Sequence, residues 1–97
     1  MAETFIKERV RIPPQSLEAE MALLGSIMLR PEAIYEIMDF IVSECFYASR
    51  HCIIFDTMIE LFGKRNPIDL LSLSSRLKEK KVLDQVGGAS YLTELVN

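Results

Sequence analysis

The sequence predicts an all-α fold, a compact cluster of five or six short helices. Apolar residues recur at intervals of three and four along most of the chain, as they do on the buried face of a helix. Ser, Asp, Gly and Pro residues that cap or break helices separate these segments. The sequence contains no convincing strand-like alternation and no internal repeat. We therefore expect an N-terminal arm over residues 1–15 and a helical domain over residues 16–97.

The first helix should begin after Pro13-Pro14, with Ser16 as its N-cap. Its apolar face is predicted to consist of Leu17, Met21, Leu24 and Met28. Glu18 and Glu20 suit the positive end of the helix dipole, and we expect both to point outward, where a partner could reach them. Gly25 costs about 1 kcal/mol relative to alanine inside a helix. Its presence predicts that another helix crosses closely there.

Pro31 can end the first helix or open the second. The apolar stripe of the second helix is Ile34, Ile37, Met38 and Ile41. Phe46 and Tyr47 are expected to anchor the following loop in the core. Ser49 is the predicted N-cap of the third helix, and Gly63 is its predicted left-handed C′ residue. Between them, the core positions are Ile54, Phe55, Met58, Ile59 and Phe62.

Asp69 is the predicted cap of the fourth helix. Its apolar positions are Leu70, Leu73 and Leu77. Lys78, Lys80 and Lys81 lie at its C-terminal end, where cations favour the helix dipole. Gly87-Gly88 reads as a loop, and a last helix is predicted over residues 89–96 through Tyr91, Leu92 and Leu95.

Composition limits the classes of function. The 97 residues are 49% hydrophobic and 26% charged, with a net charge of −3, which is typical of a globular domain and does not favour nucleic-acid binding. No run approaches the roughly 18 to 20 apolar residues of a membrane span. The charged N-terminus does not resemble a signal peptide, so we expect a cytoplasmic protein without membrane contact. Cys45 and Cys52 are too few for a disulfide framework and are expected to be buried small hydrophobes.

Motifs for chemistry are largely missing. Gly63-Lys64 lacks the other residues of a phosphate-binding loop. Cys45, His51 and Cys52 have neither the number nor the spacing of zinc ligands. An enzyme built on Cys45 or His51 would need a reactive thiol of low pKa, and we expect His51 instead to be a partly exposed residue at a helix start. We predict no catalytic, cofactor-binding or metal-binding residue.

The strongest basic cluster is "KEKK" at residues 78–81. Its position at a helix C-terminus accounts for it through the dipole and solubility. Together with Lys64 and Arg65, it leaves open an alternative function, a small helical DNA-binding domain that uses the third and fourth helices. The connection "FGKRNPID" is longer than the turn of a usual helix-turn-helix, and the acidic total weighs against this alternative.

Four stretches occur in a characteristic order: "PPQSLEAEMALLGSIML" at 13–29, "CFYASRHCIIFDTM" at 45–58, "NPIDLLSLSSRL" at 66–77 and "VGGASYLTEL" at 86–95. Together they closely resemble the N-terminal domain of the bacterial replicative DNA helicase, the DnaB family. The resemblance covers residues 11 to 97. It implies a non-catalytic interaction and assembly domain that lacks both the helical hairpin and the ATPase motor of the family.

The resemblance also implies the partners. The full-length parent would be an ATP-dependent 5′-to-3′ DNA helicase that uses ATP and Mg²⁺ and contacts DNA as a hexamer. In the family, N-terminal domains form a collar as a trimer of dimers, paired through the hairpin. Expected partners are the primase C-terminal domain, a helicase loader and other helicase subunits. Without the hairpin, this chain should be monomeric or weakly associated.

Two positions carry over as partner-binding residues. The first glutamate of "S-x-EAE" is Glu18, and the tyrosine of "GG-x-x-YL" is Tyr91. Structural roles compete with this interpretation. Glu18 suits the helix dipole, and Tyr91 could be a core ring with a solvated hydroxyl.

Overall fold

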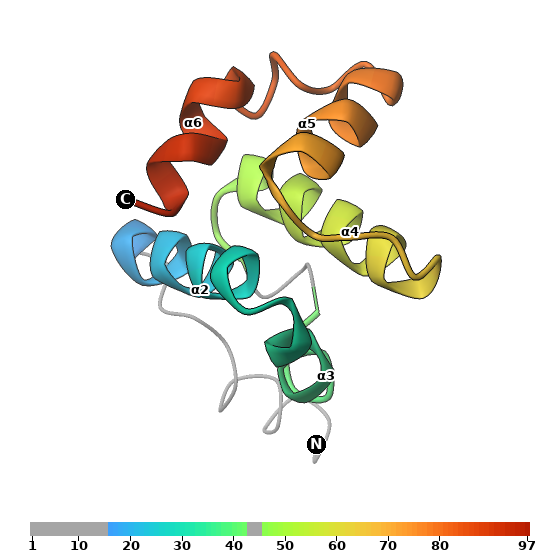
Figure 1. Ribbon diagram of the computed structural model, residues 1–97. Helices are drawn as coiled ribbons and strands as arrows, with labels where there is room; N and C mark the ends of the chain where they lie inside the picture. The colour runs from blue at the N-terminus through green and yellow to red at the C-terminus, as the bar shows by residue number, and fades with distance from the viewer. Residues whose placement is uncertain (1–15, 43–45) are drawn as a thin grey trace, which may run out of the picture.

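Five α-helices make up the described part of the chain, which is residues 16–42 and 46–97 of the computed structural model (Figure 1). They are α2 (Leu17–Leu29), α3 (Ile34–Ile37, preceded by the 3-10 turn Pro31–Ala33), α4 (Ser49–Gly63), α5 (Leu70–Glu79) and α6 (Gly88–Leu95). These ranges contain no strand, so the predicted all-α fold is confirmed. The predicted arm over residues 1–15 and Cys45 lie outside the described residues.

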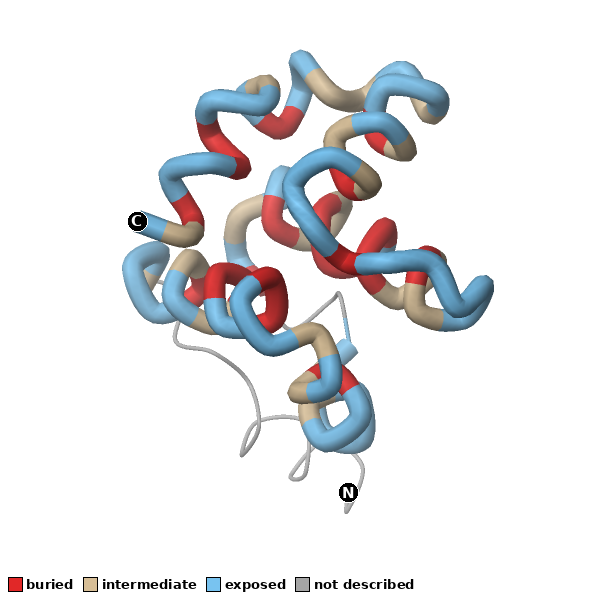
Figure 2. The backbone as a smooth tube through the Cα atoms, in the orientation of Figure 1, coloured by how far each residue is buried: buried red, intermediate tan, exposed pale blue. Residues whose placement is uncertain are grey.

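Helix α4 lies at the centre of the arrangement, packed against α2 on one side and α5 on the other (Figure 1). Helix α6 closes the domain by contacting both α2 and α5. The buried positions line the surfaces that face one another (Figure 2). Fully buried core side chains come from every long helix and include Leu24, Ile27, Ile54, Phe55, Met58, Leu73, Leu77 and Leu92. Each contributes about 1.5–3 kcal/mol of burial energy, which holds the four long helices together.

The crossing predicted at Gly25 is confirmed. A Cβ atom built on Gly25 would lie 2.1 Å from the backbone carbonyl oxygen of Leu95 in α6. Only a residue without a side chain allows α6 to approach α2 this closely. Gly25 therefore fixes where α6 packs.

The N-caps agree only in part with prediction. Asp69 accepts a hydrogen bond from the amide of Ser72 at 2.8 Å, as expected of a capping residue. Ser16 makes no side-chain capping bond. The prediction for Ser49 is wrong, because Ser49 is already helical and Ala48 occupies the N-cap position of α4. A carboxylate from another helix, that of Glu20, instead accepts from the amides of Tyr47 and Ala48, which directly precede α4.

Helices α4 and α5 end in the same way, each with a left-handed residue that is not glycine. After α4, Arg65 has φ 60°, its amide donates to the Phe62 carbonyl, and the Asn66 amide donates to the Leu61 carbonyl. After α5, Lys81 adopts φ 63° in the same hydrogen-bonding pattern, the Schellman motif. The predicted role of Gly63 is therefore wrong: Gly63 is the last residue of α4.

Several predicted core positions are exposed. Leu17 and Leu70 are the first residues of their helices, and Met38 follows the end of α3, so all three exposed residues lie at helix ends. Of the pair expected to anchor the loop, Phe46 is buried but Tyr47 is exposed.

Cys52 is half-buried rather than fully buried, and its thiol donates to the Phe46 carbonyl at 3.5 Å. Within residues 16–42 and 46–97, no helix reaches the length and apolarity that a membrane span requires.

Candidate functional site

Three polar residues from three helices meet inside the domain. Glu20 of α2 and His51 of α4 are fully buried, and Tyr91 of α6 is 8% exposed. Oε1 of Glu20 lies 2.6 Å from Nδ1 of His51, and Nε2 of His51 lies 2.5 Å from the Tyr91 hydroxyl oxygen. The histidine therefore joins α2 to α6 through the centre of the fold.

The Glu20 carboxylate also caps helix α4. Its Oε2 accepts a hydrogen bond from the Tyr47 amide at 2.6 Å, and its Oε1 accepts one from the Ala48 amide at 3.4 Å. A negative charge at the start of a helix is favourable, because the first amides have no partners within the helix. The expectation that Glu20 points outward is wrong for this reason: three N–H donors hold it inside.

His51 was expected to be partly exposed, and that prediction is wrong as well. Its ring is fully buried because both nitrogens find partners inside the domain. When Nδ1 carries the ring proton, Nδ1–H donates to the Glu20 carboxylate, and Nε2 accepts from the Tyr91 hydroxyl. Burial raises the pKa of Tyr91, which keeps this hydroxyl protonated as a donor, while the charge of Arg50 acts in the opposite direction.

Tyr91 is fixed on its ring faces as well as at its hydroxyl. The guanidinium carbon of Arg50 lies 4.1 Å from the centre of the Tyr91 ring, which is a cation–π contact. Gly87, at φ 107°, precedes α6, and a Cβ atom there would lie 2.8 Å from the Cβ atom of Tyr91. This contact explains why the turn before Tyr91 needs a glycine.

The structure does not place Glu18 in this cluster. Glu18 is exposed in the first turn of α2 and makes no side-chain hydrogen bond or ion pair with any other described residue. Tyr91, in contrast, is a core ring, and its hydroxyl binds His51 rather than solvent. The two residues that the resemblance singles out thus have different surroundings.

Sequence reasoning missed Glu20 and His51 as partners of Tyr91. A signal was present in the helical spacing. Glu20 lies four residues before buried Leu24, and His51 lies three residues before buried Ile54. A polar residue at a core position of an amphipathic helix normally has a buried hydrogen-bonding partner.

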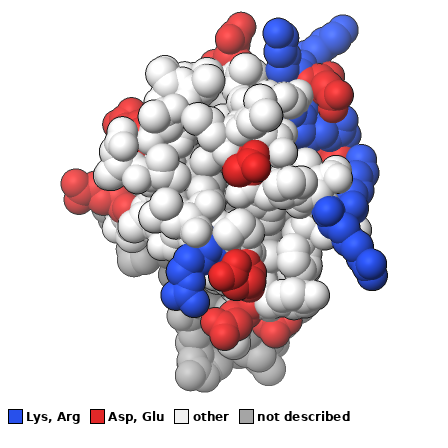
Figure 3. Space-filling model, viewed as in Figure 1, with Lys and Arg blue, Asp and Glu red and all other residues white. Residues whose placement is uncertain are grey.

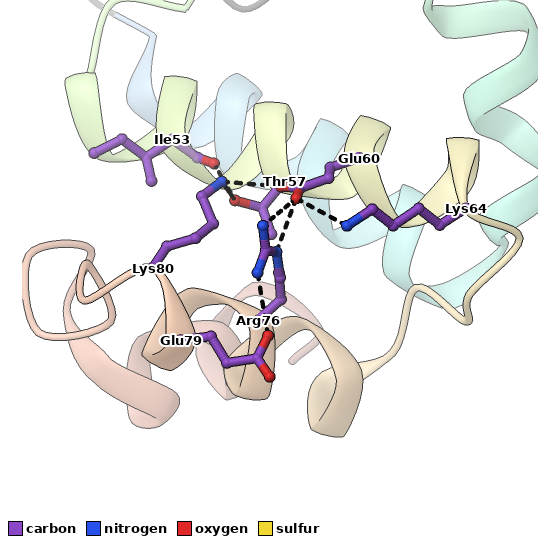
Figure 4. A network of polar contacts seen from close by, with 7 residues as sticks. All are labelled: Ile53, Thr57, Glu60, Lys64, Arg76, Glu79 and Lys80. Carbon is purple, nitrogen blue, oxygen red and sulfur yellow. Dashed lines mark hydrogen bonds and ion pairs between the residues drawn. The ribbon is translucent and has the colours of Figure 1, made fainter.

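A second polar network joins α4 to α5 at the surface (Figure 4). Glu60 is bonded to Arg76 through both Nε, at 2.8 Å, and Nη2, and Lys80 and Lys64 approach the same carboxylate at 3.2 and 3.5 Å. The hydrogen bond from Arg76, followed by that from Lys80, lowers the pKa of Glu60 to about 2. Lys80, predicted only as a favourable charge at a helix end, thus also links the two helices.

Basic side chains gather along one edge of the molecule, at the upper right of Figure 3. The exposed members, Lys64, Arg65, Lys78 and Lys81, follow or lie near the C-terminal ends of α4 and α5. The alternative DNA-binding function would use this edge. Glu60 neutralises part of its charge.

Comparison with known proteins identifies the family. The family model described as the DnaB-like helicase N terminal domain matches residues 12–97. The chain is 38% identical over 97 residues to the replicative DNA helicase DnaB of Geobacillus stearothermophilus, covering all of this chain and 21% of that protein. It is 43% identical over 89 residues to the DnaB of Haemophilus influenzae, covering 92% of this chain and 19% of that protein.

A solved structure agrees. The crystal structure of the N-terminal domain of DnaB helicase from Mycobacterium tuberculosis superposes with a TM-score of 0.83 at 32% identity, covering 88% of this chain and 62% of that one. The chain spans about a fifth of the length of these two curated relatives. The match over residues 12–97 shows that this chain belongs to the family of DnaB-like helicase N-terminal domains.

Proposed function

We propose that this domain is a non-catalytic interaction and assembly domain of a hexameric replicative DNA helicase. It forms part of an N-terminal collar and receives the primase C-terminal domain or a helicase loader. ATP-dependent 5′-to-3′ unwinding, with ATP and Mg²⁺, belongs to the motor of the full-length parent. The observation that carries the proposal is the family match over residues 12–97, in relatives named replicative DNA helicases.

The polar clusters of the domain support a scaffold. The chain Glu20–His51–Tyr91 ties α2, α4 and α6 together, and the Glu60 network ties α4 to α5. Within the described residues, no three His, Cys, Asp or Glu side chains come together as metal ligands would. A domain held rigid in this way can present exposed residues such as Glu18 to a partner at little entropic cost.

Calorimetric titration of this chain with a primase C-terminal domain tests the proposal. Saturable binding is expected, and Glu18→Ala is expected to weaken it. Glu36→Ala is the matched control, since Glu36 is also exposed near a helix start but on α3. Absence of binding, both here and in a longer chain that includes the following residues of the parent, would contradict the primase assignment.

The basic edge is the observation that supports a second candidate function, DNA binding. Fluorescence anisotropy with single-stranded and duplex DNA at low salt measures this binding. A salt-sensitive signal that Lys78→Ala and Lys81→Ala both reduce would favour this candidate, because phosphate contacts release counterions. An unchanged anisotropy at low salt would end it.

A further inference from the structure

Two exposed residues flank the N-cap of α4, and each contacts one end of the buried polar chain. Tyr47, which is 67% exposed, precedes Ala48, and Arg50 is exposed in the first turn of the helix. We call these two residues the Tyr47–Arg50 pair. Tyrosine and arginine are, together with tryptophan, the residue types enriched among the side chains that dominate binding energy at protein interfaces.

The backbone of Tyr47 is anchored to the interior of the domain. Its amide donates to the buried Glu20 carboxylate at 2.6 Å, and the next amide donates to the same group. Because the carboxylate is itself fixed by His51, the point from which the Tyr47 ring projects is fixed although the ring lies in solvent. A ring displayed from a rigid backbone loses little entropy on binding.

Arg50 is held by the other end of the same chain. Its guanidinium lies 4.1 Å from the centre of the Tyr91 ring, and the Tyr91 hydroxyl is bonded to His51. A guanidinium stacked on a ring keeps donors around its edge for a carboxylate. None of the ion pairs within residues 16–42 and 46–97 includes Arg50, whereas Arg76, Lys64 and Lys80 all share Glu60.

We propose that the Tyr47–Arg50 pair is a docking surface for an acidic segment of a partner protein. Arg50 binds a carboxylate of the segment, and Tyr47 packs against an apolar neighbour of that carboxylate. Glu20 and Tyr91 are positioning residues, since Glu20 sets the backbone of Tyr47 and the Tyr91 ring supports Arg50. The inference rests on the proposed function and refines it, because it makes the effect of Tyr91 on a partner indirect.

Titration of the intact 97-residue chain with a primase C-terminal domain provides the test. Tyr47→Ala and Arg50→Ala should each weaken binding by about tenfold or more, as truncated hot-spot residues do. The matched controls are Tyr35→Ala, at a tyrosine that is 68% exposed on α3, and Arg30→Ala, at an exposed arginine outside the ion pairs. The affinity of each control for the primase domain should stay within about twofold of the affinity of the unsubstituted 97-residue chain.

Variants at Tyr91 separate positioning from contact. Tyr91→Phe keeps the ring under Arg50 and should bind nearly as well as the parent chain, whereas Tyr91→Leu removes the ring and should weaken binding as Arg50→Ala does. In the double variant, the losses of binding free energy caused by Arg50→Ala and Tyr91→Leu should not add, because the two substitutions break the same contact. If Tyr91→Leu only destabilised the fold, its loss of binding free energy would add to that of Arg50→Ala.

Charge gives an independent readout. Added NaCl should weaken binding of the parent chain more than binding of Arg50→Ala, because the variant has lost the ion pair that salt screens. An equal salt dependence would overturn the assignment of Arg50 to a carboxylate.

The outcomes distinguish this inference from the proposed function. Binding by the parent chain that survives unchanged in Tyr47→Ala and Arg50→Ala overturns the docking surface and leaves the proposed function standing. Absence of binding by the unsubstituted 97-residue chain overturns the docking surface, and only absence of binding by the longer chain as well overturns the primase assignment of the proposed function. If the two substitutions reduce binding of a DNA oligonucleotide but not of the primase domain, the pair is a nucleic-acid contact, and the inference is wrong.

Discussion

Substitution of Gly25 by alanine tests the helix crossing through both the direction and the magnitude of the change in stability. In an isolated helix, the change would stabilise by about 1 kcal/mol, because glycine has more backbone freedom to lose. In this fold, the new Cβ atom would lie 2.1 Å from the Leu95 carbonyl oxygen and 3.1 Å from its carbonyl carbon. Steric repulsion and helix propensity therefore predict opposite outcomes.

The steric repulsion should outweigh the gain in helix propensity. Ordinary contact needs a separation of about 3.5 Å, so α6 must move away from α2 by roughly 1.4 Å. The obstructing atom belongs to the backbone and cannot rotate away, and α6 carries the buried residues Leu92 and Leu95 with it. Overpacking of this kind costs about 1–3 kcal/mol, and the upper part of that range applies to a backbone clash. After the gain in propensity, we expect a net loss of about 2 kcal/mol in the free energy of unfolding.

Urea unfolding followed by circular dichroism at 25 °C measures this loss. In a thermal melt, it corresponds to a fall in Tm of about 8–16 °C for a domain of this size. Gly63→Ala is the matched control, because Gly63 is also helical but a Cβ atom there would meet nothing within 4 Å. The control should gain stability by up to about 1 kcal/mol. If Gly25→Ala gains as much as Gly63→Ala, the close approach of α6 is refuted.

Three further predictions concern the polar contacts and a strained residue. Tyr91→Phe should lower the free energy of unfolding by about 1–3 kcal/mol in urea titration, because it leaves the buried His51 nitrogen without a donor; an unchanged midpoint would contradict the buried chain. The lowered pKa of Glu60 means that its ion pairs stabilise the fold above about pH 4.5, and this contribution disappears as the pH falls toward 2. Unfolding midpoints measured across that range should therefore decline more steeply for the parent chain than for Glu60→Gln, and parallel curves would refute the link. Lys81→Gly should raise Tm, corresponding to about 0.5–1 kcal/mol, because φ 63° costs a residue with a Cβ atom about 1–2 kcal/mol; a lower Tm would count against strain at this position.

Most of the fold is predictable from the sequence because it depends on local chemistry. Apolar stripes identify the long helices. The Asp69 cap accepts a hydrogen bond from an amide only three residues away. Gly25 predicts a close helix crossing because glycine inside a helix is otherwise unfavourable. The helix ends are less predictable, since Arg65 adopts a left-handed conformation after α4, where local preference favours glycine.

The candidate site depends on contacts that local patterns cannot specify. Ser49 has the right residue type for a cap, but Glu20, a residue 28 positions before Ala48, supplies the carboxylate instead. Tyr91 is singled out only through the family resemblance. Its environment depends on His51, 40 positions away, which the sequence predicts to be partly exposed but which is fully buried.

The capping of α4 by a carboxylate from α2 has a consequence for folding kinetics. The bond from the Tyr47 amide to Glu20 spans 27 residues, and the bond from His51 to Tyr91 spans 40. Both bonds therefore join residues that are far apart in the sequence, which raises the contact order of this helical domain. The entropy of closing these loops must be lost before either bond can form. The amides of Tyr47 and Ala48, which precede the first turn of α4, therefore gain their carboxylate acceptor only when α2 docks. Helices α2, α4 and α6 should unfold as one cooperative unit. An ordered start of α4 is thus a property of the completed tertiary structure rather than of the helix itself.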